Sequence, residues 1–192
     1  MADTLSSFWG PVTSTTECCE KNYAHSSYIA EFYNTISNIP CILLALLGLI
    51  NALRQRFEKR FTVLHLSNMA LAIGSVLYHA TLQNVQQQSD ETPMVWEMLL
   101  YLYILYSPDW HYRTTMPIFL FLYGDRFFCK EVSTWPINPQ GHAMWHLFMG
   151  FNSYFANTFL MFCRAQQRGW KPKIVRLMGV LPYVKIDKLK RK

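Results

Sequence analysis

The chain has 192 residues, of which 51% are hydrophobic, and a formal net charge of +6. The apolar residues collect in long uncharged runs, which argues against an ordinary soluble domain and indicates a membrane protein. The basic residues follow the edges of these runs and form no nucleic-acid-binding motif, so the charge does not favour a nucleic-acid partner. No repeat or linker divides the chain, and we expect a single membrane-embedded domain over residues 1–192.

Hydropathy predicts an all-α fold, a polytopic membrane helix bundle of about five spans. A helix needs about 20 residues to cross a hydrocarbon core. Four apolar runs have close to this length, at about 32–53, 61–80, 91–108 and 142–163. The third of these runs carries Glu97 in its interior. A further candidate, 114–129, is short and contains Asp125 and Arg126. These two charges would cost several kcal/mol if they faced lipid, so this segment is the weakest of the five predicted spans.

Basic residues set the expected orientation of the chain. Ten of the 18 Lys and Arg residues lie in the tail, 164–192, and four more follow the first span, whereas the N-terminal segment is acidic. By the positive-inside rule, the tail and the first loop are cytoplasmic and the N-terminus is lumenal. This orientation needs an odd number of crossings, so 114–129 has to be counted as the fourth.

Three histidines within or beside these spans are the main functional signal. His142 and His146 lie four residues apart at a helix start, so both imidazoles project from one face and can bind one metal ion. In the expected topology His79, near the end of the second span, reaches the same membrane face. Ionisable residues inside a membrane are rare and usually functional. The alternatives are a hydrogen-bonded pair at His142 and His146, and a satisfied core histidine at His79.

Three neutral histidines leave the fourth position of a zinc ion open for water, which is typical of a catalytic site. Zinc lowers the pKa of that water to about 7 and polarises a carbonyl oxygen. Ser75 lies one turn before His79 on the same helical face. Asp90 would lie at the start of the third span, where it could pass a proton from water to a leaving amine. From the residues alone, ordinary helix-start chemistry explains Asp90 better.

Three blocks of sequence, in this order along the chain, read FWGPVTSTTECCEKNYAHSSYIAEFYNTISN, GSVLYHATLQNVQQQSDETPM and NPQGHAMWHLFMGFNSYF. Together they resemble the alkaline ceramidase family, and plant members above all. The SxxxH, Asp and HxxxH set within them resembles that of a wider superfamily of intramembrane hydrolases, which includes the adiponectin receptors. The resemblance implies a zinc-dependent enzyme of the endoplasmic reticulum or Golgi membrane that cleaves the N-acyl bond of ceramide or phytoceramide. It places zinc on the three histidines, oxyanion stabilisation on Ser75 and proton transfer on Asp90.

The same resemblance implies a calcium site and a disulfide near the N-terminus. The implied calcium ligands are Glu17, the carbonyl of Cys18, Glu20, Asn22 and Glu31. Oxygen donors of this kind are those that calcium prefers, although without the family the segment is merely an acidic entry to a helix. The implied disulfide joins Cys19 to Cys129 on the lumenal face, where an oxidising compartment permits it. Cys41 and Cys163 lie inside apolar spans, and we expect them to be small buried residues.

The chain departs from this family in its length, because members have seven spans and this sequence has room for five. At Gly124 and Asp125 a stretch that resembles the family's fourth helix runs directly into one that resembles the end of the sixth. All the named ligands and catalytic residues survive this join. The leading hypothesis is a ceramidase. The alternatives are a catalytically impaired, truncated isoform that acts as a non-enzymatic membrane protein, and a metal transporter, which the clustering of polar groups at one face disfavours.

Overall fold

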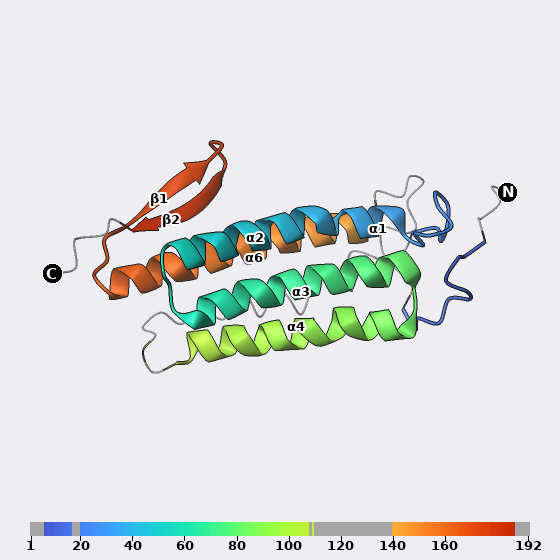
Figure 1. Ribbon diagram of the computed structural model, residues 1–192, viewed down its shortest axis with the longest axis horizontal. Helices are drawn as coiled ribbons and strands as arrows, with labels where there is room; N and C mark the ends of the chain where they lie inside the picture. The colour runs from blue at the N-terminus through green and yellow to red at the C-terminus, as the bar shows by residue number, and fades with distance from the viewer. Residues whose placement is uncertain (1–5, 17–19, 108, 110–139, 187–192) are drawn as a thin grey trace.

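Long helices packed side by side make up most of the structure, a computed structural model that describes residues 6–16, 20–107, 109 and 140–186. The elements in chain order are α1 (Phe32–Ile36), α2 (Asn38–Arg54), α3 (Lys59–Thr81), α4 (Asn84–Leu105), α6 (Gly141–Gln167), β1 (Pro172–Leu177) and β2 (Leu181–Ile186). Figure 1 shows α2, α3, α4 and α6 running alongside one another, with a β-hairpin at one end and the N-terminal segment at the other.

Two helical stretches are long and apolar enough to cross a bilayer, and both coincide with predicted spans. They are Phe32–Arg54, which comprises α1 and α2, and Lys59–Thr81, which is α3. Helices α4 and α6, with 22 and 27 residues, also have the necessary length, but polar side chains interrupt their apolar character. The predicted span 114–129 lies outside the described residues. The described part is therefore mostly helical and consistent with a membrane protein, while the count of five spans stays a prediction.

The prediction of an all-α fold is wrong in the basic tail. Residues 172–186 form an antiparallel hairpin in which Leu177 pairs with Leu181. Met178 and Gly179 in the connecting turn have φ values of 51° and 77°, the left-handed region that tight hairpin turns require. The positive charges of the tail indicate its side of the membrane, but they carry no information about this pairing.

The expected position of Asp90 at a helix start is also wrong. Helix α4 begins at Asn84, so the polar stretch before Asp90 is helical and Asp90 lies in its second turn. The N-terminal segment makes this earlier start possible, since the Asn84 amide donates to Thr13 Oγ1 at 2.9 Å. An amide at a helix start has no partner within the helix, and this contact from a distant part of the chain supplies one.

Glycines let the helices that carry the predicted site approach closely. A β-carbon on Gly74 of α3 would lie 2.0 Å from the backbone oxygen of Ser89 on α4. A β-carbon on Gly150 of α6 would lie 2.4 Å from the Cys41 sulfur on α2. Small residues commonly allow such contacts between membrane helices. Because Asp90 follows Ser89 directly, the first of these contacts sets how near Asp90 comes to α3.

Charged residues gather at the opposite end of the bundle from the histidines. Glu58 and Asp109 contact the guanidinium groups of Arg60 and Arg164, with 2.5 Å between Asp109 Oδ2 and Arg164 Nη2. Arg164 is in the last turn of α6, whereas His142 is in the first turn. Residue 109 and the start of α6 therefore lie at opposite ends of the bundle.

Candidate metal centre

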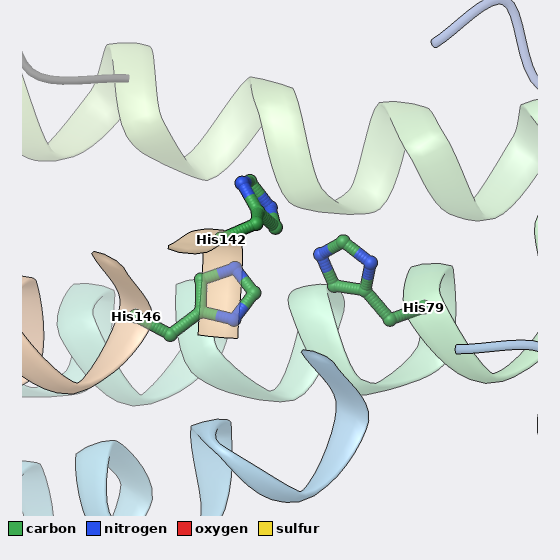
Figure 2. Close-up of side chains that lie close together, drawn as sticks. All are labelled: His79, His142 and His146. Atoms are coloured by element: carbon green, nitrogen blue, oxygen red, sulfur yellow. The ribbon is translucent and has the colours of Figure 1, made fainter. Parts of the chain in front are cut away.

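Three histidines converge between the end of α3 and the beginning of α6. His79 is in the last turn of α3, and His142 and His146 are in the first two turns of α6. One ligand atom from each residue lies within 4.8 Å of the other two. The ring centroids are 4.5 to 5.1 Å apart. Figure 2 shows the three imidazoles facing a common space between the helices.

Buried neighbours hold two of these imidazoles through their Nδ1 atoms. His79 Nδ1 lies 2.6 Å from Glu31 Oε2, and both side chains are almost completely buried. His146 Nδ1 lies 2.9 Å from Ser37 Oγ. Ser37 donates its own hydrogen to the Asn34 carbonyl at 2.8 Å, so its oxygen accepts from the imidazole. Glu31 and Ser37 thus act as acceptors for an Nδ1 hydrogen, which leaves Nε2 of each ring for a metal, as is usual for metal-binding histidines. His146 Nδ1 also lies 3.2 Å from Asn38 Nδ2, whose two hydrogens are donated to the Asn34 carbonyl and to Ser75 Oγ.

The histidine cluster fits a zinc ion in donor type and in spacing. Zinc takes imidazole nitrogens at about 2.0–2.1 Å, which places two nitrogens of a tetrahedral site roughly 3.4 Å apart. Nitrogens already within 4.8 Å of one another can reach that spacing by small side-chain rotations. Three neutral imidazoles also leave one coordination position open, the arrangement of catalytic zinc sites.

Ser75 and Asp90 line the same cavity as two of the three histidines. The cavity has a volume of about 430 Å³, and His142 and His146 also line it. Asn38 Nδ2 donates to Ser75 Oγ at 3.1 Å. The Ser75 oxygen is therefore an acceptor in this contact, and its own hydrogen can be donated to an oxygen bound in the cavity. The structure thus brings Ser75 and Asp90 to the space beside the candidate metal centre.

The cavity continues away from the histidines between α2, α3, α4 and α6. Its middle is apolar, with walls formed by Ala45, Leu71, Ala72, Met94, Met149 and Gly150. Its volume falls in the range of about 300–1,000 Å³ that small-molecule sites have. An amphipathic molecule could place its polar group at the histidines and its hydrocarbon chain in this apolar part.

Polar side chains close the deep end of the cavity. Tyr101 Oη donates to Asn157 Oδ1 at 2.6 Å, and Ser153 Oγ donates to Glu97 Oε1 at 3.4 Å. With the Asn68 amide oriented toward Glu97, Nδ2 donates to Oε2 at 2.9 Å and the amide oxygen accepts from Asn157 at 2.7 Å. These bonds satisfy a buried carboxyl group and connect α3, α4 and α6. Hydropathy shows Glu97 only as an interruption of a span, because its partners lie on other helices.

The predicted calcium ligands and the disulfide are described only in part. Four of these residues lie outside the described residues: Glu17, Cys18, Cys19 and Cys129. Both carboxylate oxygens of Glu20 accept backbone hydrogens at the start of α1, from Tyr33 and Asn34, at 2.9 and 3.0 Å. Asn22 is half-buried in the same segment, and Glu31 binds His79 as described above. Calcium binding and the disulfide stay predictions.

The two remaining cysteines are free and have packing roles. Cys41 on α2 contacts α6, where its sulfur lies 3.2 Å from the His146 carbonyl oxygen. Cys163 on α6 is 3% exposed and belongs to the main hydrophobic cluster. Both lie within helices, as the sequence predicts.

The fold and the site together describe a mostly helical protein, consistent with a membrane protein, with a candidate three-histidine metal centre. The sequence profile of the ceramidase family matches residues 10–124 and 123–185. These matches cover most of the chain, which therefore belongs to the ceramidase family, as its three sequence blocks indicate.

Alkaline ceramidases from several organisms are similar to the chain. It is 61% identical to an alkaline ceramidase of Arabidopsis thaliana, with 99% of each chain covered. It is 26% identical to alkaline ceramidase 3 of Mus musculus, with 94% of this chain and 95% of the relative covered. It is 40% identical to alkaline ceramidase YPC1 of Saccharomyces cerevisiae, with 48% of this chain and 29% of the relative covered.

The comparisons also show that the chain is internally shorter than its plant relative. The alignment with the Arabidopsis protein spans 253 positions, whereas this chain has 192 residues. The two matches to the family profile meet at residues 123 and 124. This is the place where the sequence predicts a join, at Gly124 and Asp125.

Proposed function

We propose that the chain is a zinc-dependent membrane amidohydrolase that cleaves the N-acyl bond of ceramide or phytoceramide. The products would be a sphingoid base and a free fatty acid. The observation that carries the proposal is the convergence of His79, His142 and His146, two of which, His142 and His146, line an amphipathic cavity. A ceramide-type lipid is the substrate that the names of the relatives suggest.

The residues around the centre have complementary roles in this proposal. Zinc, when bound by the three imidazoles, supplies a Lewis acid and a water molecule of lowered pKa. Asp90 accepts the proton of the attacking water and returns it to the leaving amine. Ser75 donates its hydroxyl hydrogen to the oxyanion that develops on the amide oxygen. Asn38 orients Ser75 for this by donating to its oxygen.

The polar and apolar parts of the cavity suit a lipid substrate. The amide and hydroxyl groups of a ceramide would lie at the polar end, beside the histidines, Ser75 and Asp90. A hydrocarbon chain would occupy the apolar middle, where methionines and small residues offer an adaptable surface. Burial of that hydrocarbon chain would contribute binding energy, and the bound chain would also exclude water from the scissile amide.

The location of the protein is also part of the proposal. We infer five crossings of an endoplasmic reticulum or Golgi membrane, with a lumenal N-terminus and a cytoplasmic C-terminus. Residue 109 and the start of α6 lie at opposite ends of the bundle, which is what a further crossing between them would require. The implied calcium site and the Cys19–Cys129 disulfide would then lie on the lumenal side.

A catalytically impaired isoform is the second candidate function. It is favoured by the internal stretch that the Arabidopsis relative has and this chain lacks. Such a loss would remove walls that exclude bulk water while leaving the three histidines in place.

Zinc content and turnover, measured on the same purified chain, test the two candidates. We expect about one zinc ion per chain from the three-histidine set, ceramide cleavage by the loaded protein, and loss of both in His79→Ala. His25→Ala, at a histidine outside the centre, should retain both. Zinc without turnover would support the impaired isoform, and failure of the unaltered chain to bind zinc would refute the metal centre.

A further inference from the structure

The C-terminal hairpin packs against α6 through both strands, with β2 also contacting α2, and its turn is exposed. Val184 of β2 is completely buried in the main hydrophobic cluster. The carbonyl of Pro182 accepts the Tyr154 hydroxyl at 2.8 Å, and the Ile186 amide donates to Gln55 at 3.2 Å. Tyr154 lies roughly 20 Å along α6 before its last residue, at 1.5 Å per residue. The strand therefore runs back along the bundle from the end of α6, while the turn projects away from α2 (Figure 1).

The hairpin face opposite Val184 changes from charged at its base to apolar at its turn. Alternate residues of a strand share a face, and Val184 is on the face that packs against the bundle. The opposite face consists of three register pairs: Lys173 with Lys185, Val175 with Tyr183, and Leu177 with Leu181. Beyond them, Met178 is 94% exposed and Val180 73% exposed.

This order of side chains matches the depth profile of a membrane interface. Lysines extend to the headgroups, tyrosine is enriched at the headgroup boundary, and Leu, Met and Val favour the acyl region. The hairpin lies at the bundle end that carries the arginines and lysines after α2, which the positive-inside rule assigns to the cytoplasmic side. Residues 168–186 contain five Lys and Arg residues and no Asp or Glu.

We propose that the hairpin docks onto the cytoplasmic leaflet of the host membrane as an anionic-phospholipid-binding element. The Met178 to Val180 turn inserts at the boundary between headgroups and acyl chains, and the Lys173 and Lys185 pair binds lipid phosphate and carboxylate groups. An anionic surface attracts nearby lysine and arginine side chains, and insertion removes the exposed turn from water. The proposal rests on the inferred membrane location and not on catalysis.

Photocrosslinking from the turn tests this docking directly. Met178 is replaced by the photoreactive benzoyl derivative of phenylalanine in the full chain, which is reconstituted into vesicles and irradiated. One set of vesicles contains phosphatidylcholine alone, and the other contains about one third phosphatidylserine, so that anionic charge is the variable. We expect covalent lipid adducts by mass spectrometry, with a yield at least about threefold higher in the anionic vesicles.

Charge variants provide the matched control for this experiment. Lys173→Gln combined with Lys185→Gln should lower the adduct yield in anionic vesicles to that in phosphatidylcholine, whereas Lys173→Arg with Lys185→Arg should preserve it. Both positions are exposed, so these variants should fold. Absence of lipid adducts, a yield insensitive to phosphatidylserine and to both lysines, or crosslinks between two copies of the chain instead of lipid would overturn the proposal. Ceramide cleavage measured on the same vesicles tests the proposed catalytic function separately from the docking of the hairpin.

Discussion

Two contacts that orient the rings of the histidine centre come from residues outside the SxxxH and HxxxH spacings. Glu31 and Ser37 flank the short helix α1, and they bind the Nδ1 atoms of His79 and His146. The HxxxH spacing predicts that two imidazoles share a face, because helical geometry fixes that relation. It cannot predict which side chain from another segment holds each ring. A carboxylate that the family resemblance assigns to calcium thus also serves as the partner of a candidate zinc ligand.

Removing the Glu31 carboxylate should weaken zinc binding. Glu31→Gln replaces a charged acceptor of the His79 Nδ1 hydrogen with a neutral amide, and loss of such a partner typically lowers metal affinity about 10–100-fold. Competition with a chromogenic chelator would measure the affinity. Glu58→Gln, at the far end of the bundle, is the matched control and should leave zinc affinity unchanged. Equal affinities for both variants would mean that the Glu31 contact does not support the metal centre.

At the scale of the helices, close backbone contact between α3 and α4 positions α4, the helix that carries Asp90. Gly74→Ala would force a methyl group onto the Ser89 carbonyl. We expect the free energy of unfolding to fall by about 1–3 kcal/mol, as overpacking typically causes, and turnover to fall as α4 moves away. Chemical denaturation followed by circular dichroism, together with product assays, would measure both effects.

Ile73→Ala is the control for this glycine. Ile73 precedes Gly74 and is 44% exposed, so its truncation leaves the contact between the helices intact. Turnover should remain near that of the unaltered chain. If Gly74→Ala retained both stability and turnover, the close contact would not be what places Asp90.

The ion-pair cluster at the opposite end should make stability depend on pH. Hydrogen bonds from Arg60 and Ser107 hold the pKa of Asp109 well below its usual range. Burial raises the pKa of Glu58, but the Arg164 hydrogen bond and nearby guanidinium charges outweigh it and lower the pKa overall. A carboxyl group whose pKa is depressed by folding stabilises the protein above its unfolded pKa, about 4, and loses this effect as pH falls through the folded value.

We therefore expect the thermal midpoint to fall as the pH is lowered below about 4, the range in which unfolded carboxyl groups become protonated. Asp109→Asn should reduce this dependence and lower the midpoint at neutral pH, because Arg60 and Arg164 lose a charged partner. Scanning calorimetry in detergent between neutral and acidic pH would measure the thermal midpoint of both proteins. An unchanged pH dependence in the variant would show that Asp109 contributes nothing to stability.

For the whole molecule, hydropathy and charge predict where the long helices lie better than they predict the contacts and turns that connect them. The first two spans coincide with helices because uninterrupted apolar runs determine both. Helix α4 starts earlier than predicted because an N-terminal threonine binds its first amide, and the hairpin is missed because charge in the tail dominates its pattern. The partners of Glu97 are likewise hidden, since a buried polar group is satisfied by residues distant in sequence. The bound metal, the calcium site and the count of five spans stay predictions.

An engineered glycosylation site at residues 133–139 tests the inferred topology. If the chain crosses the membrane between residue 109 and the start of α6, a site at these positions is lumenal and should be modified in a cell. A mobility shift that glycosidase removes would report the modification. The same acceptor in the 54–59 loop, which the positive-inside rule places in the cytoplasm, should remain unmodified. The reverse pattern would contradict the topology.

Ceramide cleavage by the purified 192-residue chain is the most direct test of the central claim. The zinc-loaded chain, reconstituted in detergent–lipid micelles, should release a sphingoid base and a fatty acid in equal amounts, as mass spectrometry would detect. His142→Ala should lose this activity, because two histidines cannot hold the ion in a catalytic arrangement. Cleavage that persists in His142→Ala, or no cleavage by the fully zinc-loaded chain, would contradict the proposal that this chain is a zinc ceramidase.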